Sequence, residues 1–382
     1  MPDVVFRECQ SYDFSACRKA LEQVLAPLDG LEFVKEGMCV VIKANLVSHM
    51  KPEKAATTHP TLLCALVQML REKGARVIIG DSPGSLYNPA TLAMVYRATG
   101  MTEAEHYGAE LNRDCSQKTA SYPKGKVCRS FQYTAYLDKA DAIINFCKLK
   151  SHGMMAMSNS AKNLFGVIPG TMKPEYHYKY PDGADFARMI VDLDEYFHPV
   201  LTISDAVIGM EGNGPTAGSP RRIGCVAASK SPHKLDLACA KILGLTKNEV
   251  PTLQAAYERG LIPETAEELD IEGDLDSFIV PDFVQVDNKN SLMFNNILKG
   301  KNGKLLGKVV QKLIGSEPRV KKGECIGCKK CFEICPAKAI TMKKNKPQID
   351  RSKCIRCFCC QEFCPKGAMK VHRPIVARML NR

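Results

Sequence analysis

The stretch CIGCKKCFEICP at residues 325–336 returns, with the same cysteine spacing, as CIRCFCCQEFCP at residues 354–365. Each cysteine of the first run lies 29 residues before its counterpart, and the closing prolines keep the same offset, so the segment is an internal repeat. The spacing C-x2-C-x2-C-x3-C-P is typical of thiolates that bind iron-sulfur clusters. Electron transfer is therefore the first function that the sequence predicts.

The two runs also predict which cysteines share a cluster. In this arrangement the fourth cysteine of each run binds the cluster of the other run. We expect two [4Fe-4S] clusters, the first held by Cys325, Cys328, Cys331 and Cys364, and the second by Cys354, Cys357, Cys360 and Cys335. Zinc is the alternative because four thiolates also suit it, but eight cysteines in two such runs disfavour zinc. Cys359 stands where the first run has Lys330, and we expect it not to be a ligand.

The composition is that of a folded protein with reduced thiols. A chain of 382 residues with 45% hydrophobic content has room for two or three domains. Residues 1–10 lack the long apolar stretch of a secretory signal, and no run reaches the length of a membrane span, so we expect a cytoplasmic location. The nine cysteines outside the last 58 residues form no C-x2-C pair, and we expect them to be small core residues.

The positive charge is concentrated at the C-terminal end. Residues 318–382 hold 17 Lys and Arg against 4 Asp and Glu, whereas the rest of the chain holds 36 against 37. Two oxidised clusters with their thiolates would each contribute a charge of roughly −2 and offset part of this excess. The remainder favours an acidic redox partner or an anionic small-molecule substrate. Nucleic acid is an unlikely partner because no basic-aromatic interleaving or known binding motif is present.

The larger part of the chain has the pattern of an α/β domain. From Met38 to about residue 245, short apolar runs alternate with stretches of helical periodicity, which predicts a mostly parallel sheet. We expect strands at 40–42, 76–80, 142–146 and 201–208, and a helix from Pro60 to Lys73 that Gly74 ends. The predicted organisation is an α/β domain at 1–286, a linker at 287–317 with one short helix at Lys308–Ile314, and a small α+β ferredoxin-like domain at 318–382.

Polar residues follow each predicted strand. Because ligands of open α/β sheets bind beyond the carboxyl ends of the strands, we expect these residues to share one edge of the sheet. They are Lys43, Asn45, Asp81, Ser82, Gly84, Lys148, Lys150, Ser151, His152, Glu211, Asn213 and Gly214, with Asp205 just inside its strand.

The segment Cys147–Lys173 is the densest candidate for an anion site, because it holds five Lys and His residues and no carboxylate. We expect Ser158 to cap a helix at 159–165 whose N-terminus would favour an anion. Three methionines, Met154, Met155 and Met157, would give an adaptable apolar wall. The alternative is that the lysines form a solvated face and the methionines belong to the core.

These considerations single out six residues. We expect Lys150, His152, Lys162 and Asn163 to contact an anion or substrate, and Asp81 and Asp205 to be orienting carboxylates. The alternatives are a structural histidine and aspartates that only cap the turns after their strands. The glycines at 209–218 miss the dinucleotide-binding spacing by one residue, so we predict a tight loop there.

Two resemblances follow from these motifs. Residues 318–373 resemble bacterial-type ferredoxins with two [4Fe-4S] clusters. The larger part resembles the DUF362 family through Ile42–Val47, Thr58–Pro60, Gly80–Gly84, Lys148–Gly170 and Asp205–Pro215. Members of that family often carry the same ferredoxin tail. The resemblance implies this domain layout and no particular reaction.

The leading hypothesis is an oxidoreductase in which the ferredoxin-like domain passes electrons to a ligand of the α/β domain. Fusion in one chain favours it, because tethering keeps donor and acceptor close. The alternatives are a non-enzymatic ferredoxin-type electron carrier or adaptor that docks a redox partner protein, and a sensor whose clusters report oxygen or iron.

Overall fold

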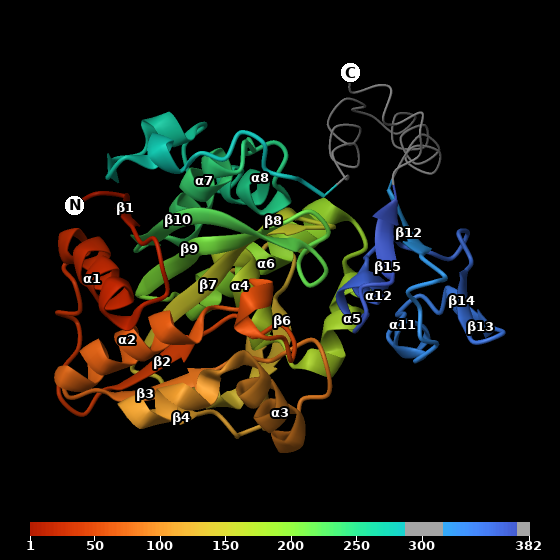
Figure 1. Ribbon diagram of the computed structural model, residues 1–382, viewed down its shortest axis with the longest axis horizontal. Coiled ribbons are helices and arrows are strands. Elements are labelled where there is room, and N and C mark those ends of the chain that lie inside the picture. Colours follow the sequence, from red (N-terminus) through yellow and green to blue (C-terminus); the bar gives the residue numbers. More distant parts are fainter. Residues whose placement is uncertain (287–315, 373–382) are drawn as a thin grey trace.

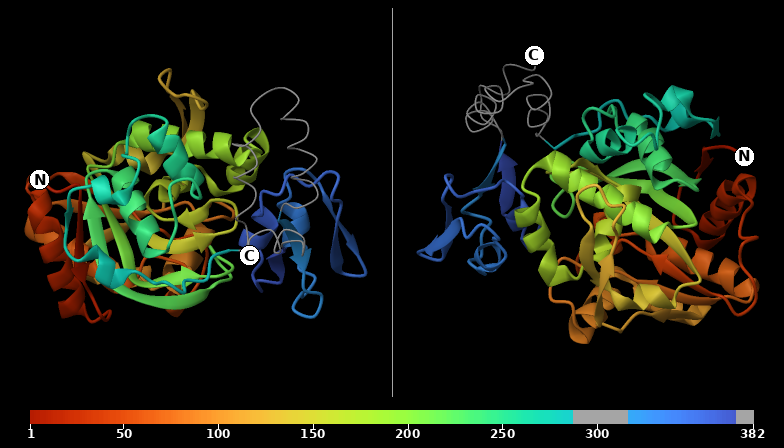
Figure 2. Two further views of the ribbon diagram at one scale, coloured as in Figure 1. Left: turned by 90° about the horizontal axis from the view of Figure 1, so that it is seen from above. Right: turned by 180° about the vertical axis from the view of Figure 1, so that it is seen from behind.

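The computed structural model describes residues 1–286 and 316–372. A large α/β domain and a small cysteine-rich module lie side by side, with the module next to helix α5 (Lys173–Lys179) in all three views (Figures 1 and 2). The short helix expected at Lys308–Ile314 and most of the predicted linker lie outside the described residues.

A mixed sheet with a parallel centre forms the α/β domain. Its strands run in the order β11-β1-β10-β9-β7-β2-β3-β4, with β8 paired to β7. The five strands from β9 to β4 are parallel, whereas β10 runs antiparallel to β9 and β1, and β1 is parallel to β11. The bounds are β1 Val4–Glu8, β2 Cys39–Lys43, β3 Arg76–Gly80, β4 Ala109–Leu111, β7 Ala142–His152, β8 Ala156–Ser158, β9 Leu201–Glu211, β10 Ser219–Ser229 and β11 Ile271–Glu272. The predicted mostly parallel α/β fold is confirmed.

Helices cover both faces of this sheet. In β2, Val40 and Ile42 join the apolar core under α1–α3, while Val41 between them joins the core on the opposite face. This alternation is what a strand buried on both faces requires. The helices are α1 Phe14–Leu25, α2 Pro60–Glu72, α3 Pro89–Thr99, α4 Ser160–Asn163, α6 Gly183–Phe197, α7 Pro232–Ile242 and α8 Pro251–Tyr257, and a separate hairpin joins β5 Gln117–Ser121 to β6 Ser130–Thr134.

The predicted strands begin close to where the observed strands begin, but two of them end several residues earlier than in the structure. The expected strand at 76–80 and helix from Pro60 are present, and Gly74 ends the helix with a positive φ of 81°. Strands β7 and β9 continue past their expected ends, to His152 and Glu211. Lys148, Lys150 and His152 therefore lie within β7 and not in a loop after it.

The cysteine-rich module repeats its own geometry. Two short helices, α11 Lys330–Glu333 and α12 Cys359–Glu362, each follow a residue with left-handed backbone, Lys329 and Phe358. Two small antiparallel pairs complete the module: β12 Glu317–Val320 with β15 Met369–His372, and β13 Ile340–Lys343 with β14 Lys346–Ile349. The repeated cysteine spacing thus corresponds to a repeated turn and helix.

The module is docked on the loop between β9 and β10. The buried Gln361 donates through Nε2 to the backbone oxygens of Asn213 and Gly214, at 2.9 and 3.0 Å. Thr216 Oγ1 donates to the backbone oxygen of Glu362 at 3.1 Å. The glycine-rich segment predicted as a tight loop is therefore a hairpin connection that holds the second domain.

Within the described parts of the chain, no helix combines the length and the apolar character that crossing a membrane requires.

Candidate functional site

Two cavities in the module gather the eight cysteines of the repeat in the predicted sets. One cavity, with about 380 Å³ of empty space, is lined by Cys325, Cys328, Cys331 and Cys364. The other, with about 330 Å³, is lined by Cys335, Cys354, Cys357 and Cys360, and also by Cys359. In each predicted set of four, three cysteines come from one run and the fourth comes from the other run.

Backbone donors support a thiolate at the fourth cysteine of each run. The amide of Ala339 lies 3.2 Å from Cys335 Sγ, and the amide of Ala368 lies 3.2 Å from Cys364 Sγ. Hydrogen bonds to sulfur are one means by which a protein sets the potential of a bound cluster. Thiol sets of this kind, with amides that donate to the sulfurs, suit [4Fe-4S] clusters.

A third cavity lies where the parallel strands end and the module begins. It has about 560 Å³ of empty space, part of it open to solvent. Its polar lining comes from the α/β domain as Asn45, Asp81, Ser82, Lys150, His152, Ser158, Lys162, Asn163, Lys173 and His177, and from the module as Glu362 with the ring of Phe363 beside it. We call this space the lysine cavity. It brings together five of the six residues singled out from the sequence.

The lysine cavity holds more positive than negative charge. Asp81, directly after β3, is neutralised by Lys43, whose Nζ lies 2.8 Å from Asp81 Oδ1. Gly166 permits this contact, since a Cβ at that position would lie 2.3 Å from the same oxygen. Glu362 is then the one remaining carboxylate of the lining, and it faces three lysines.

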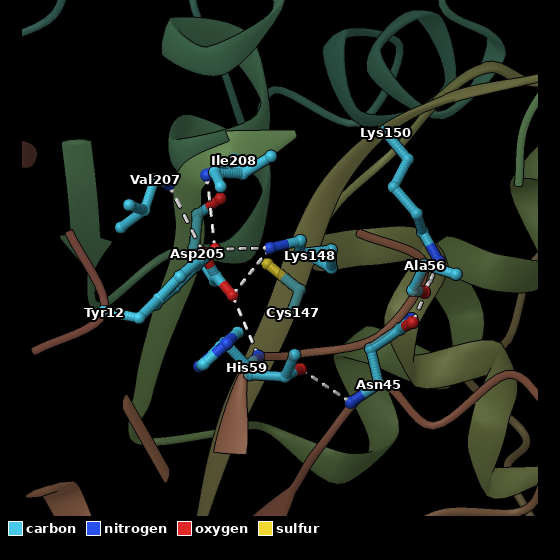
Figure 3. A network of polar contacts seen from close by, with 12 residues as sticks. Tyr12, Asn45, Ala56, His59, Cys147, Lys148, Lys150, Asp205, Val207 and Ile208 are labelled. Carbon is cyan, nitrogen blue, oxygen red and sulfur yellow. Dashed lines mark hydrogen bonds and ion pairs between the residues drawn. The ribbon is translucent and has the colours of Figure 1, made fainter. Parts of the chain in front are cut away.

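Two of those lysines bind only neutral oxygens. Lys150 Nζ donates to Asn45 Oδ1 at 2.9 Å and to the backbone oxygen of Ala56 at 2.7 Å, as Figure 3 shows. Lys173 Nζ donates to the backbone oxygens of Ser82 and Ile168. Burial, which disfavours the charged form, lowers the pKa of Lys150 and of Lys173 to about 7 in each case.

The third lysine of the lining, Lys162, has no hydrogen-bond acceptor among the described residues. Its ammonium lies over the ring of Phe165, 4.5 Å from the ring centroid. Burial also lowers the pKa of Lys162, while the charge of Glu362 opposes this shift. The three lysines therefore line one space with no carboxylate partner other than Glu362 among its lining residues.

Asn163 joins the ends of the strands behind these lysines. Its Oδ1 accepts from Asn45 Nδ2 at 2.9 Å, and its Nδ2 donates to Asn145 Oδ1 at 2.7 Å and to the backbone oxygen of Lys43 at 3.1 Å. Because Asn45 in turn accepts from Lys150, this amide network fixes where the Lys150 ammonium lies. Asn163 is thus placed to orient the lining of the lysine cavity.

The two histidines of the lysine cavity are kept neutral. His152 Nδ1 accepts from the amides of Met154 and Met155 at 3.1 and 3.2 Å, so the ring proton belongs on Nε2, which lies 3.2 Å from Glu362 Oε1. Burial lowers the pKa of His152, and it lowers the pKa of His177 to about 3. Although burial alone would raise the pKa of Glu362, the contact with His152 and the charge of Lys162 hold it at about 2.

Asp205 does not line the lysine cavity with Asp81. It lies in a separate buried network, in which its carboxylate accepts from Lys148 Nζ and Tyr12 OH at 2.8 Å each and from the amide of His59 at 2.9 Å (Figure 3). The rings of Tyr12 and His59 stack with centroids 3.5 Å apart. This network fastens the N-terminal segment and the start of α2 to strands β7 and β9.

The expected anion site at the start of a helix is occupied by the protein itself. Helix α4 begins at Ser160, and the side chain of its N-cap residue, Asn159, makes no capping hydrogen bond. Asp236 of α7 instead accepts from the amides of Ser160 and Ala161, at 2.7 and 3.0 Å. Ser158 belongs to β8, so the prediction that it caps this helix is wrong. The three methionines, Met154, Met155 and Met157, are core residues.

Three residues of the lysine cavity could not be predicted from the sequence. His177 lies in α5 and carries no local signal of its role. Glu362 and Phe363 lie between Cys360 and Cys364 in the second cysteine run, and no motif there indicates that they line a cavity. Their part in the cavity follows from how the module docks, which a single sequence does not reveal.

Comparisons with known proteins identify both parts of the chain. The model of a domain of unknown function, DUF362, matches residues 40–241, and a 4Fe-4S dicluster domain matches residues 324–368. The thylakoid-associated protein sll1697 of Synechocystis sp. is 33% identical over 269 residues, which cover 68% of this chain and 79% of that protein. Among solved structures, the lactate racemase apoprotein from Thermoanaerobacterium thermosaccharolyticum aligns at 12% identity with a TM-score of 0.42, over 63% of this chain and 57% of that one.

Proposed function

We propose, given that this chain belongs to the DUF362 family and ends in a 4Fe-4S dicluster domain, that it is an oxidoreductase acting on a small anionic molecule in the lysine cavity. The dicluster domain makes the chain an iron-sulfur electron-transfer protein. One observation carries the step to an enzyme. Glu362 and Phe363, the two residues before the proposed cluster ligand Cys364, line the same cavity as Lys150, Lys162 and Lys173.

The anionic character of the ligand follows from the lysines. Lys150 and Lys173 donate to neutral oxygens, and Lys162 makes no hydrogen bond among the described residues. A carboxylate or phosphate between them would accept charge-assisted hydrogen bonds and restore their ordinary protonation. Asn163 and the Lys43–Asp81 pair would hold the lining in place.

A residue that would move protons is also in position. Lys150 has a pKa of about 7, which suits a group that gives and takes protons near neutrality. The neutral His152 holds its proton at Nε2 beside Glu362 and would orient the ligand. When bound, two [4Fe-4S] clusters would supply one electron each, and a redox partner protein would replace those electrons. A two-electron reduction of the ligand would take up two protons from solvent, passed on by Lys150.

Lys162→Met is the sharpest test of the anion site, because the substitution removes no hydrogen bond to any described residue. The full chain is reconstituted anaerobically and acetate binding is measured by calorimetry. We expect the Kd to rise about tenfold or more while the cluster absorption is kept. Lys19→Met, at an exposed position of α1, is the matched control. Equal acetate affinity in both variants would contradict the proposal.

The alternative of a ferredoxin-type electron carrier also has an observation in its favour. Ile326 and Phe332 are 61% and 47% exposed in the basic module, near the exposed Cys328. An apolar pair among lysines suits an acidic redox partner. Salt-sensitive binding of an acidic ferredoxin or flavodoxin, without reoxidation of the reduced clusters by any small anion, would favour the carrier.

A further inference from the structure

A large groove runs between the α/β domain and the cysteine-rich module, and the proposed function makes no use of it. It encloses about 1380 Å³, including some open solvent. One wall comes from the α/β domain through residues 47–49, 84–86, Thr91, Met94 and Thr171, and the other from the module through Lys330, Glu333, Ile334 and residues 362–365.

The groove adjoins the lysine cavity. Val47, Gly84, Glu362 and Phe363 line both spaces. A Cβ added at Gly84 would lie 3.0 Å from Cζ of the Phe363 ring, so a glycine at this point lets the ring approach the backbone. Phe363 therefore stands at the boundary of the two spaces, and a ligand longer than the lysine cavity would reach the groove beside this ring.

The groove has an apolar wall that is otherwise unexplained. Leu86 and Met94 are 61% and 42% exposed, and both line it. Val47, Ile334 and Phe363 add apolar surface around them. Large aliphatic side chains that line a space beside a charged cavity are typical of sites that take the apolar part of a ligand.

The far end of the groove lies against the first cysteine cavity. Lys330, Cys364 and Pro365 line both the groove and the cavity that holds Cys325, Cys328 and Cys331. A ligand in the groove would thus lie next to the cluster that we assign to this cavity. The part of the ligand in the groove, rather than its anionic end, is then the part nearest to the electrons.

We propose that the ligand is an amphipathic anion, with a carboxylate or phosphate among Lys150, Lys162 and Lys173 and an apolar, unsaturated body in the groove between Leu86, Met94 and Phe363. This inference rests on the proposed function and specifies its substrate class. Small hydrophilic anions fill only the lysine cavity and leave the groove empty.

The experiment compares two carboxylates that differ in their apolar part. Binding of acetate and of cinnamate to the anaerobically reconstituted full chain is measured by calorimetry, with Leu86→Asp as the groove variant and Lys162→Met as the cavity variant. We expect cinnamate to bind at least about tenfold more tightly than acetate, because its ring and double bond bury apolar surface in the groove. Leu86→Asp should remove most of this difference and leave acetate affinity unchanged, whereas Lys162→Met should weaken both ligands.

The outcomes separate this inference from the function on which it rests. If acetate binds and cinnamate binds no better, or if Leu86→Asp leaves the cinnamate affinity unchanged, the amphipathic class is wrong and the anion site stands. If neither carboxylate nor inorganic phosphate binds, the proposed function fails and this inference with it. If Leu86→Asp instead lowers the molecular mass found by light scattering without changing cinnamate affinity, the groove is a contact between copies of the chain, which also overturns the inference.

Discussion

His152 Nε2 at the end of β7 lies 3.2 Å from Glu362 Oε1 in α12, so the last residue of a central strand meets the residue two positions before a proposed cluster ligand. Glu362 is 14% exposed, and Lys162 faces the same space. The contact joins the two domains at the lysine cavity. The docked module therefore forms one side of the cavity.

Docking itself depends on Gln361. Replacing it with Ala removes two hydrogen bonds to the β9–β10 loop, and the oxygen of Asn213 then keeps only the amide of Ala217 as a donor. We expect docking to weaken by about 1–3 kcal/mol, seen as faster hydrogen exchange at residues 212–216. Gln348→Ala, at an exposed position of β14, is the matched control and should leave exchange unchanged. Equal protection in both variants would show that Gln361 does not hold the module.

Gly166 should be sensitive to a single methyl group. A Cβ at this position would lie 2.3 Å from Asp81 Oδ1 and 2.5 Å from Lys43 Nζ, so Gly166→Ala must displace the buried ion pair. We expect the free energy of unfolding to fall by about 1–3 kcal/mol, measured by denaturant titration. Gly183→Ala has no atom within 4 Å of the new Cβ and should be neutral or slightly stabilising. If both variants lose the same stability, the loss does not come from the ion pair.

Anion binding should depend on pH through the lysines. In the folded protein the pKa of Lys150 and of Lys173 is about 7, below the ordinary 10.5, so between these values the unfolded chain carries protons that the folded one lacks. Protein stability therefore rises with pH in this window, while affinity for an anion falls. A bound anion raises these pKa values again, so binding at pH 8 should take up about one proton.

Calorimetry in buffers with different ionisation enthalpies measures this proton uptake. Lys150→Met should reduce the uptake and flatten the loss of affinity above pH 7, provided that circular dichroism shows the variant folded. Acetate binding that is independent of pH between 6 and 9 in the parent protein would mean that the lysines do not contact the anion.

The cysteines of α12 should differ in their importance. Cys360 belongs to the proposed ligand set of the second cluster, whereas Cys359 only shares its cavity. We expect about eight irons per chain in the parent protein and about four in Cys360→Ala, with Cys359→Ala close to the parent. Iron analysis and absorption spectra after anaerobic reconstitution measure this. If Cys359→Ala loses iron and Cys360→Ala keeps the iron content of the parent protein, Cys359 is the ligand and Cys360 is not.

The sequence predicts those features that depend on local pattern. Residues 77–79 are an apolar run that Gly80 follows, so both the strand and the position of Asp81 at its carboxyl end follow from general rules for parallel sheets. The cysteine spacing likewise predicts which thiols meet, because the repeat carries its geometry with it. The strand depends on residues adjacent in the chain, and the pairing of thiols depends on a spacing that both cysteine runs share.

Features that depend on residues far apart in the sequence cannot be predicted in this way. Strand β7 continues through Lys148 and Lys150, which no strand pattern favours, because Asp205 and Asn45 from other segments accept their hydrogen bonds. For the same reason the sequence gives no sign that Asp205 pairs with Lys148 instead of sharing a cavity with Asp81. A buried lysine is stable only when the folded protein supplies hydrogen-bond acceptors for its ammonium group. A prediction from local polarity alone therefore puts such lysines in loops, which is wrong here.

The consecutive residues Glu362, Phe363 and Cys364 also restrict how this protein can change. A carboxylate for the lysine cavity, a ring shared with the groove and a cysteine of the first cluster cavity follow one another without a spare residue. A ferredoxin with the same cysteine spacing but other residues before its last cysteine would not substitute for this module. The α/β domain and the cysteine-rich module are therefore matched as a pair, and we expect that modules exchanged between relatives will dock only if these three residues are kept.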